Sequence, residues 1–229
     1  MKRILYIAAT ALVCASCFHV NTNYKGGKNA INGEGDVISK SFDFKDFDQI
    51  VINGHADVEF TQSSAYEVTV RTQENVLEWL DYKVDGTTLI IETKEHRDIR
   101  AKNYDLFIQA PQLKKLTVNG ASDFNIKDHL RMDGDLTVQV NGAGDLDFDN
   151  VTCDSFSVEV NGAADANLHA IDIRKDLKVQ VNGAGDVNIS GNAKDVTLEV
   201  HGAGDIDARG LNVSGEVSKH TAGLAKINI

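Results

Sequence analysis

A five-residue phrase, Asn-Gly-Ala-Gly-Asp or a close variant, returns about every twenty residues through the second half of the chain. Successive copies begin 22, 20, 21 and 19 residues apart. Repeats this short cannot bury a core alone, so they predict stacked units rather than a compact core around one special site. The copies occupy residues 119–123, 141–145, 161–165, 182–186 and, with His in the first place, 201–205.

Apolar and polar side chains alternate on both sides of each copy. In the second copy, Val138 and Val140 flank Gln139 before the phrase, and the alternation resumes from Leu146 to Phe148 after it. A period of two is the pattern of a half-buried strand. Each unit is therefore predicted to be a strand, a glycine-rich bend, a second strand and a connecting loop.

The apolar positions of successive copies are in phase, and no helical segment separates them. Stacking each strand in parallel on its counterpart, about 4.8 Å away, makes one continuous core. A hairpin also fits strand, turn, strand, but it does not explain the fixed phase. We therefore predict an all-β fold, a parallel β-helix (solenoid) with about 20 residues per coil, a length that suits a wide, right-handed coil.

The glycines and asparagines of the phrase have separate roles. Gly142 and Gly144 stand where the chain must leave one sheet and enter the next, which requires positive φ or close backbone approach. Asn141 tolerates the left-handed region, and its side chain can bond to the Asn of a stacked neighbour. A ladder of Asn side chains is expected at this corner.

Two looser copies of the phrase, at residues 32–36 and 53–57, suggest that the repeat begins near residue 32. The 66 residues from Asn53 to Asn119 carry no phrase and are interpreted as about three degenerate coils with an insertion. This stretch should hold strands at 67–71 and 89–93, a turn at Asp85-Gly86 and a short amphipathic segment at 74–82.

The predicted organisation has three parts. It consists of a signal peptide at 1–16, a flexible tether at 17–35 and a single β-helix domain at 36–229, irregular over 36–115 and regular over 116–229. At the far end, Lys226 takes the place of the Asp, where a cation would cap the acidic row.

The N-terminus indicates export. Lys2 and Arg3 precede an apolar run over residues 4–13 and then Cys-Ala-Ser-Cys, the pattern of a secretory signal. It resembles a bacterial lipobox in which Cys17 is the acylated first residue of the mature chain, although Cys14 stands where Leu is usual. An ordinary cleaved signal and a membrane helix are the alternatives, and the run is too short to span a bilayer comfortably. We expect a lipid anchor at Cys17.

The mature chain is strongly acidic. Loss of Lys2 and Arg3 with the signal leaves 21 basic and 34 acidic residues, a net charge of −13. Such a surface repels nucleic acid and anionic headgroups, so we expect no nucleic-acid partner and membrane attachment through lipid alone. Cys153 would be the other mature thiol, expected to be buried in a connecting loop; a reactive or dimer-forming thiol is the alternative.

The Asp that closes each copy raises the question of calcium. Stacked carboxylates about 4.8 Å apart repel by roughly 1 kcal/mol per pair even in water. The phrase superficially resembles the calcium-binding nonapeptide repeat, but its Asp follows the second Gly directly and its period is about 20. We expect each Asp to accept N–H bonds from its own Gly turn, with no metal and no cofactor. The calcium alternative concerns Asp123, Asp145, Asp165, Asp186 and Asp205.

Catalytic motifs are missing from the sequence. The seven His residues lack the paired spacing of a zinc site, and there is no Ser nucleophile elbow, phosphate loop or Cys/His pair. The charged stretch at 94–100 is expected to be a solvated loop, with a binding patch as the alternative.

The repeated Val-Asn-Gly-Ala-Gly-Asp, together with FDQIVING at 47–54 and APQLKKL at 110–116, resembles the putative auto-transporter adhesin, head GIN domain family over about residues 40–229. The resemblance implies a right-handed β-helix, a cell-envelope lipoprotein or secreted protein of a Bacteroidetes-type bacterium, and no established activity. Residues 18–23, after Cys17, contain no acidic side chain, which favours the periplasmic leaflet of the outer membrane over the cell surface.

The expected function is that of a non-catalytic envelope lipoprotein, an adhesin-like module that presents polar β-helix faces to glycan or protein. An enzyme acting on envelope polysaccharide and a structural spacer are the alternatives. A cleft with acidic and basic side chains near His96, Arg97 or His129 would favour the enzyme. The two candidate rows are Gln139, Glu159, Gln180 and Glu199, and Asn125, Asp147, Asn167, Asn188 and Asp207.

Overall fold

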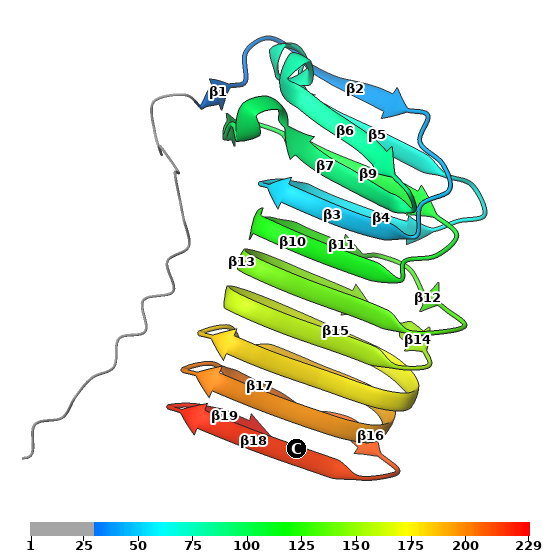
Figure 1. Ribbon diagram of the computed structural model, residues 1–229, viewed down its shortest axis with the longest axis vertical. Coiled ribbons are helices and arrows are strands. Elements are labelled where there is room, and N and C mark those ends of the chain that lie inside the picture. Colours follow the sequence, from blue (N-terminus) through cyan, green and yellow to red (C-terminus); the bar gives the residue numbers. More distant parts are fainter. Residues whose placement is uncertain (1–29) are drawn as a thin grey trace, which may run out of the picture.

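The structure, a computed structural model, describes residues 30–229. These residues form a parallel β-solenoid of about five turns with about 21 residues per turn, so the predicted fold class is confirmed (Figure 1). The predicted signal peptide, the anchor residue Cys17 and most of the tether lie outside the described residues. Within residues 30–229, no helix is both long and apolar enough to cross a membrane.

The regular coils occupy residues 115–228 and stack in the predicted phase. Val138 pairs with Val158, and Phe148 with Leu168, in parallel register. The strands are β10 (Lys115–Ala121), β11 (Asp123–Ile126), β12 (Leu130–Arg131), β13 (Leu136–Asp149), β14 (Val151–Cys153), β15 (Phe156–Gly183), β16 (Val187–Gly202), β17 (Asp205–Val213), β18 (Val217–Gly223) and β19 (Lys226–Asn228).

Each coil has three faces. The first face precedes the phrase and the second follows it, as expected, but the predicted connecting loop is a third face of short paired strands. In it, Arg131 pairs with Thr152, and Thr152 with Asp172. The alternation is too short there to be read as a strand, yet it adds Leu130, Val151, Ile171 and other apolar side chains to the core. Cys153 is buried as expected, in β14 rather than in a loop.

The core is a column of inward side chains along the stack. Phe124 and Phe148 lie with ring centroids 5.9 Å apart, and Phe148 stacks on Phe156 at 6.1 Å. Val, Leu and Ile fill the other inward positions and are almost fully buried. Burial of apolar area at every rung is what stabilises the stack.

The corner leaves no room for a side chain at the first glycine of the phrase. Gly142 has φ +154°, and a Cβ on it would collide with the carbonyl oxygen of Gly120 in the preceding coil. The second position carries a side chain in two other coils, Ser122 and Ala164, although a Cβ on Gly144 itself would collide with the Ser122 carbonyl oxygen. The glycines therefore serve close stacking as well as the bend.

Residues 30–114 differ from the expectation of degenerate coils in series. Their elements are β1 (Ile31–Asn32), β2 (Val37–Phe42), β3 (Gln49–Gly54), β4 (Asp57–Gln62), β5 (Glu67–Gln73), the 3-10 helix η1 (Glu74–Trp79), β6 (Leu80–Asp85), β7 (Thr88–Thr93), the 3-10 helix η2 (Lys94–His96), β8 (Ile99–Arg100) and β9 (Tyr104–Ala110). β2, β5 and β9 pair antiparallel, as do β6 and β7, and together they form a cap over one end of the solenoid.

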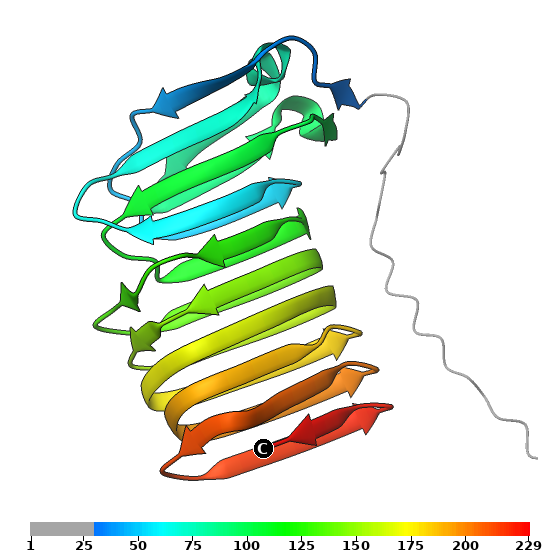
Figure 2. The ribbon, with the colours of Figure 1, turned by 180° about the vertical axis from the view of Figure 1, so that it is seen from behind.

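The coils are stacked out of sequence order. β3 pairs with β10 on one side and with β7 on the other, and β4 lies likewise between β11 and β9. Figure 2 shows this coil, in cyan, between two green ones. The 66-residue interval is therefore an excursion that builds the cap and returns, so that Asn119 stacks directly on Asn53.

The proposed copy at residues 32–36 is wrong. Asn32 pairs with Arg100 in a separate two-stranded sheet and does not stack on Asn53. The strands expected at 67–71 and 89–93 and the turn at Asp85-Gly86 are present.

Candidate functional site

The predicted Asn ladder runs along the corner between the first and second faces. Asn119 donates to Asn53 at 2.9 Å, Asn141 to Asn119 at 2.9 Å, Asn161 to Asn141 at 3.0 Å and Asn182 to Asn161 at 2.8 Å. Each amide is at once donor and acceptor, so the corner is a fixed polar edge.

The Asp residues form the expected column, but with a different hydrogen-bond donor. The Asp165 carboxylate accepts the backbone N–H of Asp186 at 2.8 Å, and Asp186 accepts that of Asp205 at 2.9 Å. The donor is a backbone N–H of the next coil and not one from the residue's own Gly turn. In parallel strands the backbone N–H groups point along the stack, toward the neighbouring coil. At the far end Asp205 accepts the N–H of Lys226, which takes the Asp position as predicted.

The column continues through the coil of β4 to the cap. Asp123 is in register with Asp57, and Asp57 with Asp105, where Arg71 pairs with the carboxylate at 3.0 Å. Partial burial, and then the charge of its neighbour Asp123, raise the pKa of Asp57. The same two causes raise the pKa of Asp145. Within residues 30–229, no three His, Cys, Asp or Glu side chains are placed to hold a metal ion together.

A groove of about 540 Å³ opens on the second face beside this column. Phe107 lies in it with 36% of its surface exposed, at the register position where the next coils carry Glu59, Asn125 and Asp147. Lys127 pairs with Glu59 at 2.8 Å across the groove. The lining of the groove combines this aromatic ring with carboxylate and amide groups and with the cations Arg71 and Lys127.

Amide and carboxylate side chains extend from this groove down the second face. Asn167 donates to Asp147 at 2.8 Å and Asn188 donates to Asn167 at 3.0 Å. These are residues of the second predicted row, now placed side by side. Phe107 and Lys127 were not foreseen, because neither recurs in the repeat.

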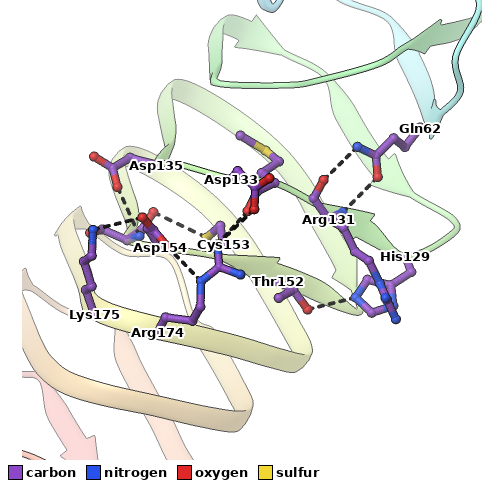
Figure 3. Close-up of polar contacts among 12 residues, drawn as sticks. Gln62, His129, Arg131, Asp133, Asp135, Thr152, Cys153, Asp154, Arg174 and Lys175 are labelled. Atoms are coloured by element: carbon purple, nitrogen blue, oxygen red, sulfur yellow. Dashed lines mark hydrogen bonds and ion pairs between the residues drawn. The ribbon is translucent and has the colours of Figure 1, made fainter.

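A second groove, of about 650 Å³, lies on the third face. Figure 3 shows its polar side chains: Arg131 and His129 on one side, Arg174 on the other and Thr152 between them. Arg174 donates to Asp154 at 2.8 Å and to the Met132 carbonyl at 2.9 Å. These residues belong to the stretches first taken for loops, so the repeat gave no signal of them.

This groove combines acidic and basic groups near His129, the arrangement that favours an enzyme. The hydrogen bonds argue against one such role, that of His129 as a base for the Thr152 hydroxyl. His129 Nδ1 lies 3.3 Å from the Arg131 Nε–H and must accept from it, so the ring proton is on Nε2, 2.9 Å from the Thr152 hydroxyl. A histidine in this tautomer donates to the hydroxyl and cannot take its proton.

Near His96 and Arg97 the structure holds a smaller groove of about 450 Å³. The Arg97 guanidinium lies 4.4 Å from the ring centroid of Trp79 and pairs with Glu95 at 2.9 Å. The stretch expected to be a solvated loop therefore folds as η2 and β8 and packs partly on the cap.

The model of one protein family covers residues 46–171 and 165–229. That family is the putative auto-transporter adhesin, head GIN domain. The chain belongs to it. The GIN domain thus spans the coil of β3 and β4, the cap strands from β5 to β9 and every regular coil, and the resemblance noted in the sequence is confirmed.

Solved structures share the fold of this GIN domain. A putative adhesin from Bacteroides fragilis NCTC 9343 is 20% identical with a TM-score of 0.72, over 87% of this chain and all of that one. A putative adhesin from Parabacteroides distasonis ATCC 8503 is 23% identical with a TM-score of 0.74, over 87% and 84%. A putative lipid binding protein from the same organism is 21% identical with a TM-score of 0.54, over 87% and 99%. No curated protein matches the GIN domain of this chain.

Proposed function

We propose that this protein is a non-catalytic, adhesin-like binding module of the cell envelope that holds a glycan along its second face. The observation that carries the proposal is the exposed Phe107 ring beside an ordered row of carboxylates and amides. An aromatic ring packs on the apolar face of a sugar, while carboxylate and amide groups accept from and donate to its hydroxyls. The names of the related adhesins, which indicate no enzyme, support this assignment.

The test is a glycan array probed with the mature domain and with two variants. Phe107→Ala should lower the signal for any bound glycan roughly fivefold or more, since stacking on a ring contributes about 1 kcal/mol or more. Leu224→Ala, which removes another exposed apolar side chain (89% exposed) far from the groove, should leave it unchanged. An array without a reproducible hit, or equal losses in both variants, would contradict a glycan-binding second face.

We further propose that the module is tethered by a lipid on Cys17, in the periplasmic leaflet of the outer membrane. The Cys-Ala-Ser-Cys pattern and the absence of acidic residues over 18–23 support this. Cys17→Ser should release the protein from the membrane fraction. Retention of that variant in membranes would contradict lipid anchoring.

A further inference from the structure

Arg131 is the best-positioned unpaired cation on the third face. Gln62 fixes its backbone, accepting the Arg131 N–H at 2.9 Å and donating to the Arg131 carbonyl at 2.8 Å. Its Nε–H is directed onto His129. Within residues 30–229 Arg131 forms no ion pair, whereas the neighbouring Arg174 pairs with Asp154. A guanidinium has five N–H donors, so its Nη groups remain available in the groove.

The hydroxyl of Thr152 is a second donor with a fixed direction. Since His129 Nε2–H donates to the Thr152 oxygen, the hydroxyl's own hydrogen has to point to another acceptor. Thr152 lines the groove next to Arg131, with which it is in register. Arg131 and Thr152, on either side of the His129 ring, line the same groove and offer charged N–H and neutral O–H donors, the groups that recognise an oxyanion.

The other wall adds acceptors. Asp172 is in register with Thr152, and Asp133 lies beside Arg174, whose guanidinium is 3.8 Å away. A bare anion would be repelled by these carboxylates, whereas a sugar could donate its hydroxyls to them. The groove therefore suits a ligand with an oxyanion at one end and hydroxyl groups at the other.

We propose that the third-face groove binds an acidic sugar, with its carboxylate or phosphate on Arg131 and Thr152 and its hydroxyls toward Asp172. The site lies on a different face from the Phe107 groove and shares no lining residue with it. This proposal is therefore independent of the proposal that the second face binds a glycan. His129 acts as a positioning residue that orients both donors.

The experiment is an NMR titration of the mature domain that follows the backbone amide signals of Thr152 and Asp172 in every variant and, in the parent protein, also the Arg131 Nε–H signal. D-glucuronate and glucose 6-phosphate distinguish a carboxylate from a phosphate source, and D-glucose is the neutral control. We expect a saturable shift with at least one acidic sugar, and the one that binds more tightly identifies the source. Arg131→Gln should weaken that binding roughly tenfold or more, as expected for the loss of charge-assisted hydrogen bonds.

The chain offers a matched control in Arg100, which also forms no ion pair within the described residues and lines none of the three grooves. Arg100→Gln should bind as the parent does. Arg131→Lys, which keeps the charge but loses the planar fork, should bind with intermediate affinity and guards against misfolding of Arg131→Gln. No shift with either acidic sugar, glucose bound as tightly, or equal losses in the Arg131 and Arg100 variants would overturn the proposal.

Discussion

At the scale of single residues, the acidic column is held by a balance between repulsion and hydrogen bonding. Asp165, Asp186 and Asp205 each accept a backbone N–H from the next rung, which offsets the crowding of charge. Asp145 lies among Asp123, Asp165 and Asp147, and its carboxylate accepts no hydrogen bond from residues 30–229. The column therefore has an uncompensated member.

Asp145→Asn should stabilise the folded protein at pH 7 by about 0.5 kcal/mol, a small value because the site is exposed to solvent. The pKa of Asp145 is raised in the folded state, so the folded protein binds the proton more tightly than the unfolded one. Its charge thus costs stability at neutral pH, and the cost vanishes as pH falls below about 4. Urea unfolding of both proteins at pH 7 and pH 3 checks this; a gain of equal size at both pH values would contradict it.

At the scale of elements, two sequence features determine the corner of each coil: the first glycine of the phrase and the Asn before it. The first glycine allows the carbonyl of the preceding coil to approach, and the Asn beside it bonds to the Asn of that coil. Both features recur with the period of the repeat, which is why the sequence predicts them well. The third face escapes prediction because its strands in the first coils, β12 and β14, are only two and three residues long, and because in β15 it is set off by register shifts at Leu168/Ile171 and Ile173/Asp176.

Gly142→Ala should destabilise the domain by more than about 2 kcal/mol, because the new methyl group meets backbone that cannot move without shifting the whole rung. Gly134 provides the matched control. It also has positive φ, +130°, but open space surrounds its Cβ position. Gly134→Ala should therefore cost less, from backbone strain alone. Thermal unfolding that ranks the two variants equally would disprove the stacking explanation.

The ladder stops at His201, which occupies the Asn position but makes no hydrogen bond to Asn182. His201→Asn should extend the ladder by one rung and stabilise the protein by about 0.5–1 kcal/mol, the usual net contribution of a hydrogen bond. Differential scanning calorimetry would measure this as a rise in Tm. An unchanged or lower Tm would show that the ladder does not contribute to stability.

At the scale of the whole molecule, the repeat predicts the solenoid but not its order of stacking. Periodicity identifies the rungs because each one repeats the same inward and outward positions. It contains no information on which rung lies against which once the phrase is interrupted between Asn53 and Asn119. The Phe107 groove and the Arg131 groove were not predicted for the same reason, since neither Phe107 nor Arg131 recurs in the repeat.

The rates of amide hydrogen exchange should differ along the solenoid, because each coil contacts only its neighbours in the stack. Amides of β13 and β15 lie between two neighbouring rungs and should exchange slowest. Those of β18 and β19 lie at the end of the described stack, where every residue of β18 is exposed, and should exchange fastest. Uniform protection along the solenoid would show that the domain opens only as one cooperative unit.

The position of the coil formed by β3 and β4 has a consequence for how such molecules change in length. This coil pairs through β3 with the cap strand β7 on one side and with β10, the first strand of the regular repeats, on the other. Duplication or loss of a regular coil beyond β13 therefore moves the far end by about 4.8 Å and leaves the cap and the Phe107 groove as they are. Homologues that have gained or lost coils can in this way differ in the length of the solenoid while keeping the same cap.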